Sequence, residues 1–159
     1  MHLEARSPSC FSTEYLLKLD DRPVGRFRGR WFSEGIDVRL TERLQLHFEK
    51  DSWLGSNFRL IDAHSEEILA SGSRSGFFTR SWDLALKSGP AQLVASGLFS
   101  TGYEVRLQDR MAARATRIDW CSGGWQVVSD ATLDATDVVF VGLVYHTILK
   151  RQRNNNNST

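Results

Sequence analysis

Arginines recur at alternate positions in the stretch "RPVGRFRGRW", residues 22–31. Arg26, Arg28 and Arg30 lie two positions apart, and Arg22 precedes them at a turn. Successive side chains of a β-strand point to opposite faces, so this spacing places the three guanidinium groups on one face. Guanidinium groups bind phosphate oxygens through paired hydrogen bonds. The stretch therefore predicts either a basic face for anionic lipid head groups or phosphates, or a solvated outer surface that needs no ligand.

The histidines and cysteines are weaker candidates for chemistry. The chain contains four histidines: His2, His47, His64 and His146. Their spacing matches no metal-binding motif, and His146 lies in an apolar segment, where we expect a core histidine with one hydrogen bond. Cys121 lies beside a glycine turn in "WCSGGW", but no adjacent residue supplies the base that a reactive thiol needs.

The composition is that of an ordinary soluble globular protein, with 41% hydrophobic and 25% charged residues. The 159 residues predict one domain with its own core. A net charge of +1 gives no general attraction to nucleic acid, so we expect no such partner. The residues "MHLEARSPSCF" lack the pattern of a secretory signal, and two cysteines are too few for a disulfide framework. We therefore expect a cytoplasmic protein.

The elements that must position these residues include an apolar segment, 138–149, near the C-terminus. Its 12 residues, which include His146 and Thr147, are fewer than the roughly 20 that a membrane-spanning helix needs. A transmembrane span is therefore not expected. Almost no face of the segment is polar, which is typical of a helix buried in the middle of a protein.

Charged residues on both sides of this segment favour a helix over a strand. Asp134 can cap the first amides, and Asp137 lies in the first turn. Cations at the other end suit the negative end of a helix dipole: Lys150, Arg151 and Arg153. We predict a helix over residues 135–151. The Asn-rich residues 154–159 form a low-complexity tail that we expect to be disordered.

The preceding residues form three similar units. The segments "YLLKLDD", "FRLIDA" and "EVRLQDR" alternate apolar residues before an acid, with anchors at Asp21, Asp62 and Asp109. The anchors are 41 and 47 residues apart, a spacing typical of internal repeats. Each unit has four segments that read as strands. Three four-stranded blades are too few for a propeller, but twelve strands can close into one barrel without free edges.

The helix and the strands fit each other in size. A helix about 10 Å across needs a barrel wider than one of eight strands, whose own side chains fill the interior. We therefore predict a mainly β fold over residues 1–153: a closed antiparallel twelve-stranded barrel from three four-strand repeats, with the C-terminal hydrophobic helix through its centre. Because this helix fills the lumen, carriage of a small apolar ligand inside the barrel is disfavoured.

This arrangement, with its ending "DATDVVFVGLVYHTILKR", resembles the tubby C-terminal-like superfamily, which includes tubby domains, phospholipid scramblases and plant LURP-one-related proteins. The resemblance covers residues 3–151 and implies a twelve-stranded barrel around a central helix. It also implies binding of anionic phospholipids or phosphoinositides. No segment matches the head-group residues of tubby or the calcium-binding segment of scramblases.

Together these observations predict a non-enzymatic binding module. We expect weak binding of anionic phospholipids or phosphoinositides through the outer basic face of Arg22, Arg26, Arg28 and Arg30, or an interaction with another protein. No metal or cofactor is expected, and we expect a monomer at the periphery of a membrane. The alternative is an enzyme with a site at the barrel rim that involves Cys121 or His64.

Overall fold

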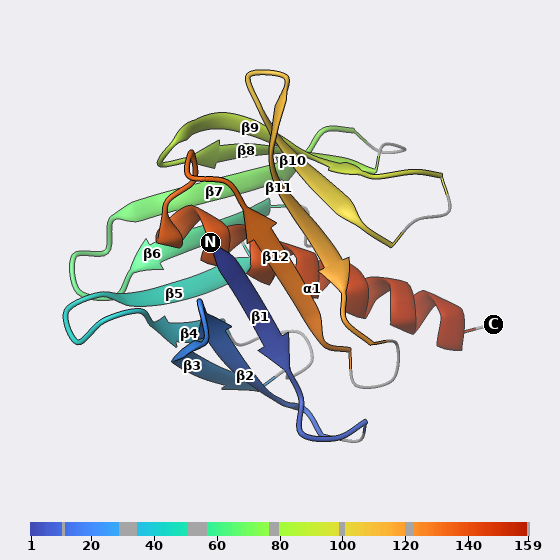
Figure 1. The fold of residues 1–159 in the computed structure, drawn as a ribbon, viewed down its shortest axis with the longest axis horizontal. Helices are drawn as coiled ribbons and strands as arrows, with labels where there is room; N and C mark the ends of the chain where they lie inside the picture. Colours follow the sequence, from blue (N-terminus) through green and yellow to red (C-terminus); the bar gives the residue numbers. More distant parts are fainter. Residues whose placement is uncertain are drawn as a thin grey trace.

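The computed structural model describes residues 1–10, 12–28, 35–50, 57–76, 80–98, 101–119 and 123–158. Within them the chain forms twelve strands followed by one helix, α1 (Ala135–Asn157) (Figure 1). The strands are β1 (His2–Arg6), β2 (Glu14–Leu19), β3 (Arg22–Arg28), β4 (Ile36–Arg39), β5 (Gln45–Lys50), β6 (Asn57–Asp62), β7 (Ile68–Arg74), β8 (Ser81–Leu86), β9 (Gly89–Ala95), β10 (Tyr103–Leu107), β11 (Arg110–Arg117) and β12 (Trp125–Ser129).

The strands pair antiparallel in one sheet that curves around α1 (Figure 1). The order is β3-β2-β1-β12-β11-β10-β9-β8-β7-β6-β5-β4, so β3 and β4 are the end strands. These two strands lie side by side. Gly25 of β3 is so close to β4 that a Cβ built on it would lie 3.4 Å from Cγ1 of Val38. No strand ladder joins them within the described residues. The predicted twelve-stranded barrel is confirmed, but it is nearly closed, with two edges facing each other where none was predicted.

Two of the three predicted acidic anchors form tight turns. Asp20 and Asp21 between β2 and β3 have φ values of 47° and 66°, and Gln108 and Asp109 between β10 and β11 have values of 52° and 63°. Two consecutive residues with positive φ are the signature of a hairpin turn whose twist matches that of its strands. Aspartate tolerates this conformation well, which explains its place in both turns.

The third anchor, Asp62, works differently. It ends β6, and its Oδ1 accepts hydrogen bonds from the amides of His64 at 2.8 Å and Ser65 at 3.4 Å. The turn is longer here, and Glu66 is the residue with positive φ, at 62°. The three units therefore share the same succession of strands, but the turns after their acidic anchors differ in length.

The helix α1 is the core of the barrel. Its residues from Thr136 to Leu149 are all buried, as the continuous apolar run predicted. The helix lies closest to β12 and β1 at Gly142, where a Cβ would lie 2.5 Å from the ring of Trp125 and 2.8 Å from Cδ2 of Leu3. Glycine at this position is what allows the large indole ring to lie against the helix backbone.

The start of α1 is fixed by two aspartates. Asp134 is the N-cap, and its Oδ1 accepts a hydrogen bond from the amide of Asp137 at 3.0 Å, as predicted. Asp137 is fully buried, and its carboxylate accepts from the amides of Lys87 at 2.8 Å and Ser88 at 3.0 Å, and from the Ser88 hydroxyl. The buried carboxylate thereby joins the first turn of the helix to the β8–β9 turn.

The predicted end of the helix is wrong. The helix continues beyond Arg151 to Asn157, through residues that were expected to belong to a disordered tail. Asparagine has a modest helix propensity, but extending a helix that is already formed adds one hydrogen bond per residue without a new nucleation cost. The cations at 150–153 therefore lie inside the helix, where it leaves the barrel, and not in its last turn.

Candidate functional site

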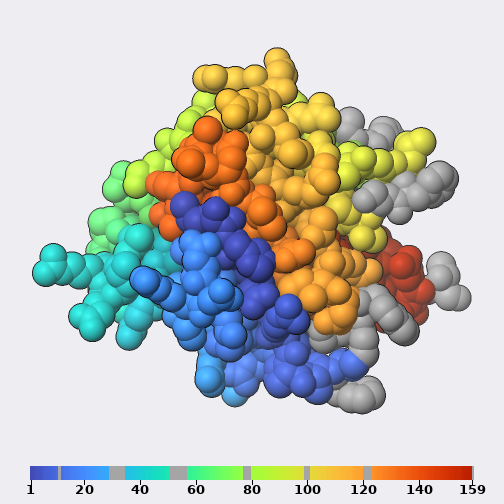
Figure 2. Space-filling view, viewed as in Figure 1, coloured from blue at the N-terminus to red at the C-terminus, as the bar shows by residue number. Residues whose placement is uncertain are grey.

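A groove with a volume of about 340 Å³ lies on the outer side of β1, β2 and β3. The N-terminal residues that form these strands, in blue, come to the surface on the face shown in Figure 2. The groove is lined by charged, polar and apolar side chains: Glu4, Arg6, Ser7, Pro8, Glu14, Leu16, Lys18 and Arg26. It is a shallow surface site, in keeping with a lumen that the helix fills.

The predicted arginine face is present on β3. Arg22, Arg26 and Arg28 are all exposed, and Phe27 between the last two is buried, so the strand alternates as predicted. Arg26 lines the groove opposite Leu16 of β2. The fourth predicted residue, Arg30, lies outside the described residues.

The acids around the groove neutralise only part of its charge. Glu4 is held by Arg6, whose Nε lies 3.1 Å from Oε2 of Glu4. Glu14 lies opposite Arg28 in the β2–β3 register. Within the part of the chain that the structure describes, three side chains on this face form neither a hydrogen bond nor an ion pair: Lys18, Arg26 and Arg28. Arg22, at the β2–β3 turn opposite Leu19, likewise forms neither.

Lys18 and Arg6 were missed by the sequence analysis. Lys18 follows Leu16 at the spacing of one face of a strand, so its outward direction could have been inferred. That it meets Arg26 across one groove depends on the pairing of β2 with both β1 and β3, which the sequence does not display.

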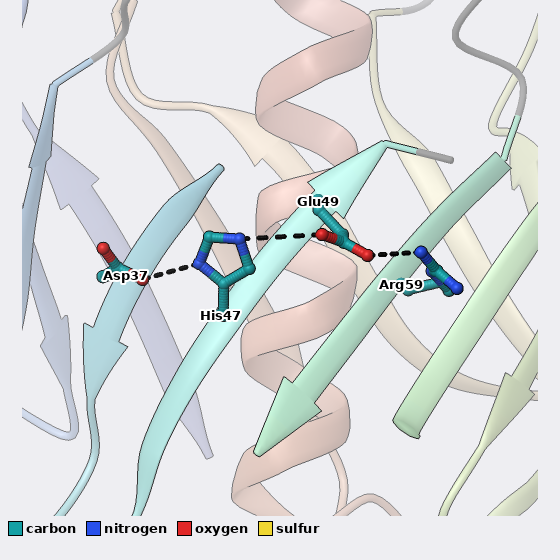
Figure 3. Close-up of polar contacts among 4 residues, drawn as sticks. All are labelled: Asp37, His47, Glu49 and Arg59. Carbon is teal, nitrogen blue, oxygen red and sulfur yellow. Dashed lines mark hydrogen bonds and ion pairs between the residues drawn. The ribbon is translucent and has the colours of Figure 1, made fainter. Parts of the chain in front are cut away.

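A row of four polar side chains crosses β4, β5 and β6 on the outer wall (Figure 3). Nδ1 of His47 lies 2.6 Å from Oδ1 of Asp37, and Nε2 lies 3.7 Å from Oε2 of Glu49. Arg59 Nη2 then lies 2.5 Å from Oε1 of Glu49. Both ring nitrogens of His47 face carboxylates, so neither is directed toward a substrate.

The strand register accounts for this row. Asp37 is directly opposite His47, and Glu49 is directly opposite Arg59. Glu49 and Arg59 are oppositely charged, and a cross-strand pair of this kind stabilises a sheet by roughly 0.2–1 kcal/mol. We assign the row a structural role, which is to hold the end strand β4 onto its neighbours. The sequence analysis considered His47 only as a metal ligand and missed these partners.

The structure does not show a catalytic site around the two residues that the sequence analysis considered for an enzyme, His64 and Cys121. His64 is exposed in the β6–β7 turn, where its backbone amide binds Asp62. Cys121 lies outside the described residues. Among the residues that the structure places, no group of three or more histidine, cysteine or acidic side chains could hold a metal ion. An enzymatic function at the rim therefore stays an untested prediction.

Two further findings concern Cys10 and the length of the helix. Cys10 is disulfide-bonded, which the sequence analysis did not predict. The described part of the chain contains no helix that combines the length and the apolar character needed to cross a membrane.

His146 is a core histidine with one hydrogen bond, as predicted. It is buried in α1, and its Nδ1 accepts a hydrogen bond from Nε1 of Trp125 at 3.1 Å. Burial, and to a smaller extent the charges of Lys150 and Arg153, lower the pKa of His146 from 6.5 to about 3. The imidazole is therefore neutral in the folded protein at ordinary pH.

This low pKa makes stability depend on pH. Above pH 6.5 the imidazole is neutral in the folded and in the unfolded protein, so it does not change the free energy of unfolding. Below pH 6.5 the imidazole takes up a proton in the unfolded chain but stays neutral in the folded protein. The free energy of unfolding should therefore fall as the pH drops from 6.5 toward 3, by at most about 1.4 kcal/mol per pH unit from this group. Urea denaturation of the wild type and of His146→Gln between pH 6.5 and pH 5 measures the effect as a difference in slope. Parallel slopes would contradict it.

Comparison with known proteins adds no relative: no family model, curated protein or solved structure matches this chain.

Proposed function

We propose that this protein is a non-enzymatic binding module that takes anionic, phosphate-bearing head groups of phospholipids on the outer face of β1–β3. The observation that carries the proposal is a groove of about 340 Å³ lined by two unpaired cations, Lys18 and Arg26, with two more unpaired cations nearby: Arg28 on the same face of β3 and Arg22 at the β2–β3 turn. Exposed cations without acidic partners keep their hydrogen-bond donors available for phosphate oxygens.

The net charge of the groove supports an anionic ligand over a cationic one. Glu4 is already held by Arg6, so Glu14 is the remaining carboxylate among the lining residues. Two unpaired cations among the lining residues, Lys18 and Arg26, outnumber it. Apolar atoms of Leu16 and Pro8 also line the groove and can contact the first carbons beyond a head group.

The expected affinity is low. Each basic side chain near an anionic membrane surface contributes about 1 kcal/mol, and the attraction falls off within a Debye length. A few such contacts give transient, salt-sensitive recruitment to the periphery of a membrane and no permanent anchoring. The resemblance to the tubby C-terminal-like superfamily points to the same class of ligand.

Vesicle flotation tests the proposal. The wild type should float with vesicles that contain phosphatidylserine and stay behind with phosphatidylcholine alone, and binding should weaken at high salt. Changing Arg22, Arg26 and Arg28 to Ser should weaken binding roughly 100-fold, from about 1 kcal/mol per residue, while the melting temperature changes little.

The matched control removes three exposed arginines elsewhere on the barrel: Arg43, Arg106 and Arg110. It changes the net charge by the same amount and should bind as the wild type does. If the two triple variants behave alike, or if the wild type ignores acidic vesicles, the groove is a solvated wall and the proposal is wrong.

A further inference from the structure

The groove on the outer face of β1–β3 carries charges of both signs along one strand. Glu14, Leu16 and Lys18 follow one another at alternate positions of β2, and all three line the groove. Alternate residues of a strand point to the same face and lie roughly 6.6 Å apart. The strand therefore presents to the groove an acid, then an apolar side chain, then a base.

Two cations of the groove are available to a phosphate. Arg26 of β3 lies directly opposite Leu16 and lines the groove together with Lys18. Neither cation has a hydrogen bond or an ion pair among the described residues. Glu4 lies opposite Lys18 on β1, but it is held by Arg6, whose Nε is 3.1 Å from Oε2 of Glu4. Lys18 and Arg26 therefore keep their donors for a ligand.

The carboxylate of Glu14 is available as well. Glu14 lies directly opposite Arg28, but the two side chains form no ion pair in the described structure, and Arg28 does not line the groove. The hydrogen bond from Glu14 to the Ser12 hydroxyl comes from its backbone amide. A ligand that is only anionic would bring a second negative charge close to this carboxylate, and like charges repel. The groove therefore suits a ligand that also carries a positive group.

A primary ammonium matches Glu14 better than the other groups that accompany phosphate in lipid head groups. An ammonium donates hydrogen bonds and also neutralises the carboxylate, whereas a hydroxyl donates one hydrogen bond and leaves the charge. A trimethylated ammonium has no N–H to donate and is bound by the faces of aromatic rings. None of the described residues that line the groove is aromatic.

We propose that the groove takes a ligand in which a primary ammonium accompanies the phosphate, as in the head groups of aminophospholipids. The phosphate oxygens accept from Lys18 and Arg26, the ammonium donates to Glu14, and the carbons between them lie over Leu16. The volume of about 340 Å³ is near the lower end of the range for ligand pockets, which suits a small head group. This assignment rests on the function proposed above and names the chemical class of the head group.

Two soluble probes that differ in the ammonium test the assignment. O-phosphoethanolamine and phosphocholine carry the same phosphate monoester, and only the first has N–H donors. In NMR titrations of the full chain, O-phosphoethanolamine should bind roughly tenfold more tightly, because it forms one additional hydrogen bond to a charged group. Backbone amide resonances of residues 14–18 should shift with both probes.

Glu14→Gln removes the charge of the acceptor with almost no change of shape. It should weaken binding of O-phosphoethanolamine roughly tenfold, while phosphocholine binds no more weakly than before, so that the two probes become nearly equal. A melting curve confirms that the variant folds. The matched control is Glu42→Gln, which removes the same charge from an exposed position outside the groove and should keep the wild-type preference.

The outcomes separate the choice of head group from phosphate binding itself. If both probes bind the wild type equally well, or if Glu14→Gln preserves the ratio of their affinities, the groove binds phosphate without recognising the ammonium, and only the present assignment is wrong. If neither probe binds and the wild type ignores acidic vesicles, the assignment and the proposed function are both wrong.

Vesicles separate a lipid head group from a free phosphate compound. Phosphatidylserine and phosphatidylglycerol carry the same net charge, and only phosphatidylserine has an ammonium. At equal lipid content and ionic strength the wild type should float better with phosphatidylserine, and Glu14→Gln should remove the difference. Equal flotation of the wild type with both lipids, together with a preference between the soluble probes, would assign the groove to a free aminoalkyl phosphate and overturn the lipid head group.

Discussion

Leu143→Ala should lower the free energy of unfolding by about 2–5 kcal/mol, the range for truncating a large core side chain. Leu143 is fully buried in the middle of α1 and is surrounded by the barrel wall. A strand ladder joins each neighbouring pair from β3 around to β4, so the wall cannot easily move inward to fill the space that the change leaves. The loss should therefore lie toward the upper end of the range. Urea denaturation followed by tryptophan fluorescence measures it.

The same substitution on the surface is its control. Leu98 is 88% exposed, so Leu98→Ala should change the free energy of unfolding by no more than about 0.5 kcal/mol. If the two leucine variants had equal stability, the central position of the helix would be wrong.

Asp137→Ala should destabilise the protein by about 3 kcal/mol or more. The change removes a buried carboxylate and leaves three donors of the β8–β9 turn without an acceptor, two of them backbone amides. Hydrogen bonds to a charged group contribute about 1.5–3 kcal/mol each, and an orphaned buried donor adds its own desolvation penalty. Thermal and chemical denaturation measure the loss, and amide hydrogen exchange at Lys87 and Ser88 should become faster.

An exposed aspartate on the adjoining strand gives the comparison. Asp83 of β8 makes one long hydrogen bond, 3.4 Å from Gln92, and Asp83→Ala should have little effect. An Asp137→Ala variant as stable as Asp83→Ala would show that the carboxylate does not join the helix to the turn.

The fold could be predicted from the sequence because the pattern of apolar residues within each strand is local. Alternating apolar residues marked the inward positions, and Leu17, Leu60 and Val105 are indeed fully buried. The continuous apolar run marked a helix with no exposed side, and Asp134 marked its start. The end of α1 was missed because residues 154–157 have no strong preference of their own and follow the helix that precedes them.

The sites were less predictable because they depend on which strands are neighbours. Alternation alone placed Arg26 and Arg28 outward, but their relation to Lys18 follows from pairing that no local pattern specifies. The same holds for Asp37 and His47, ten residues apart, which meet only because β4 and β5 pair in one register. Contacts between such residues could not be read from composition or spacing.

The place of β1 in the wall has a consequence for how the chain folds. β1 pairs with β12, and Leu3 lies opposite Val127, so the two strands that complete the cylinder come from opposite ends of the sequence. Contacts between residues so far apart in the sequence slow folding. During synthesis the first strand has only one of its two neighbours until β12 has left the ribosome, and α1 follows directly after. Until β12 pairs with β1, the chain exposes an edge of β1 in addition to the edges of β3 and β4, and an exposed strand edge invites aggregation.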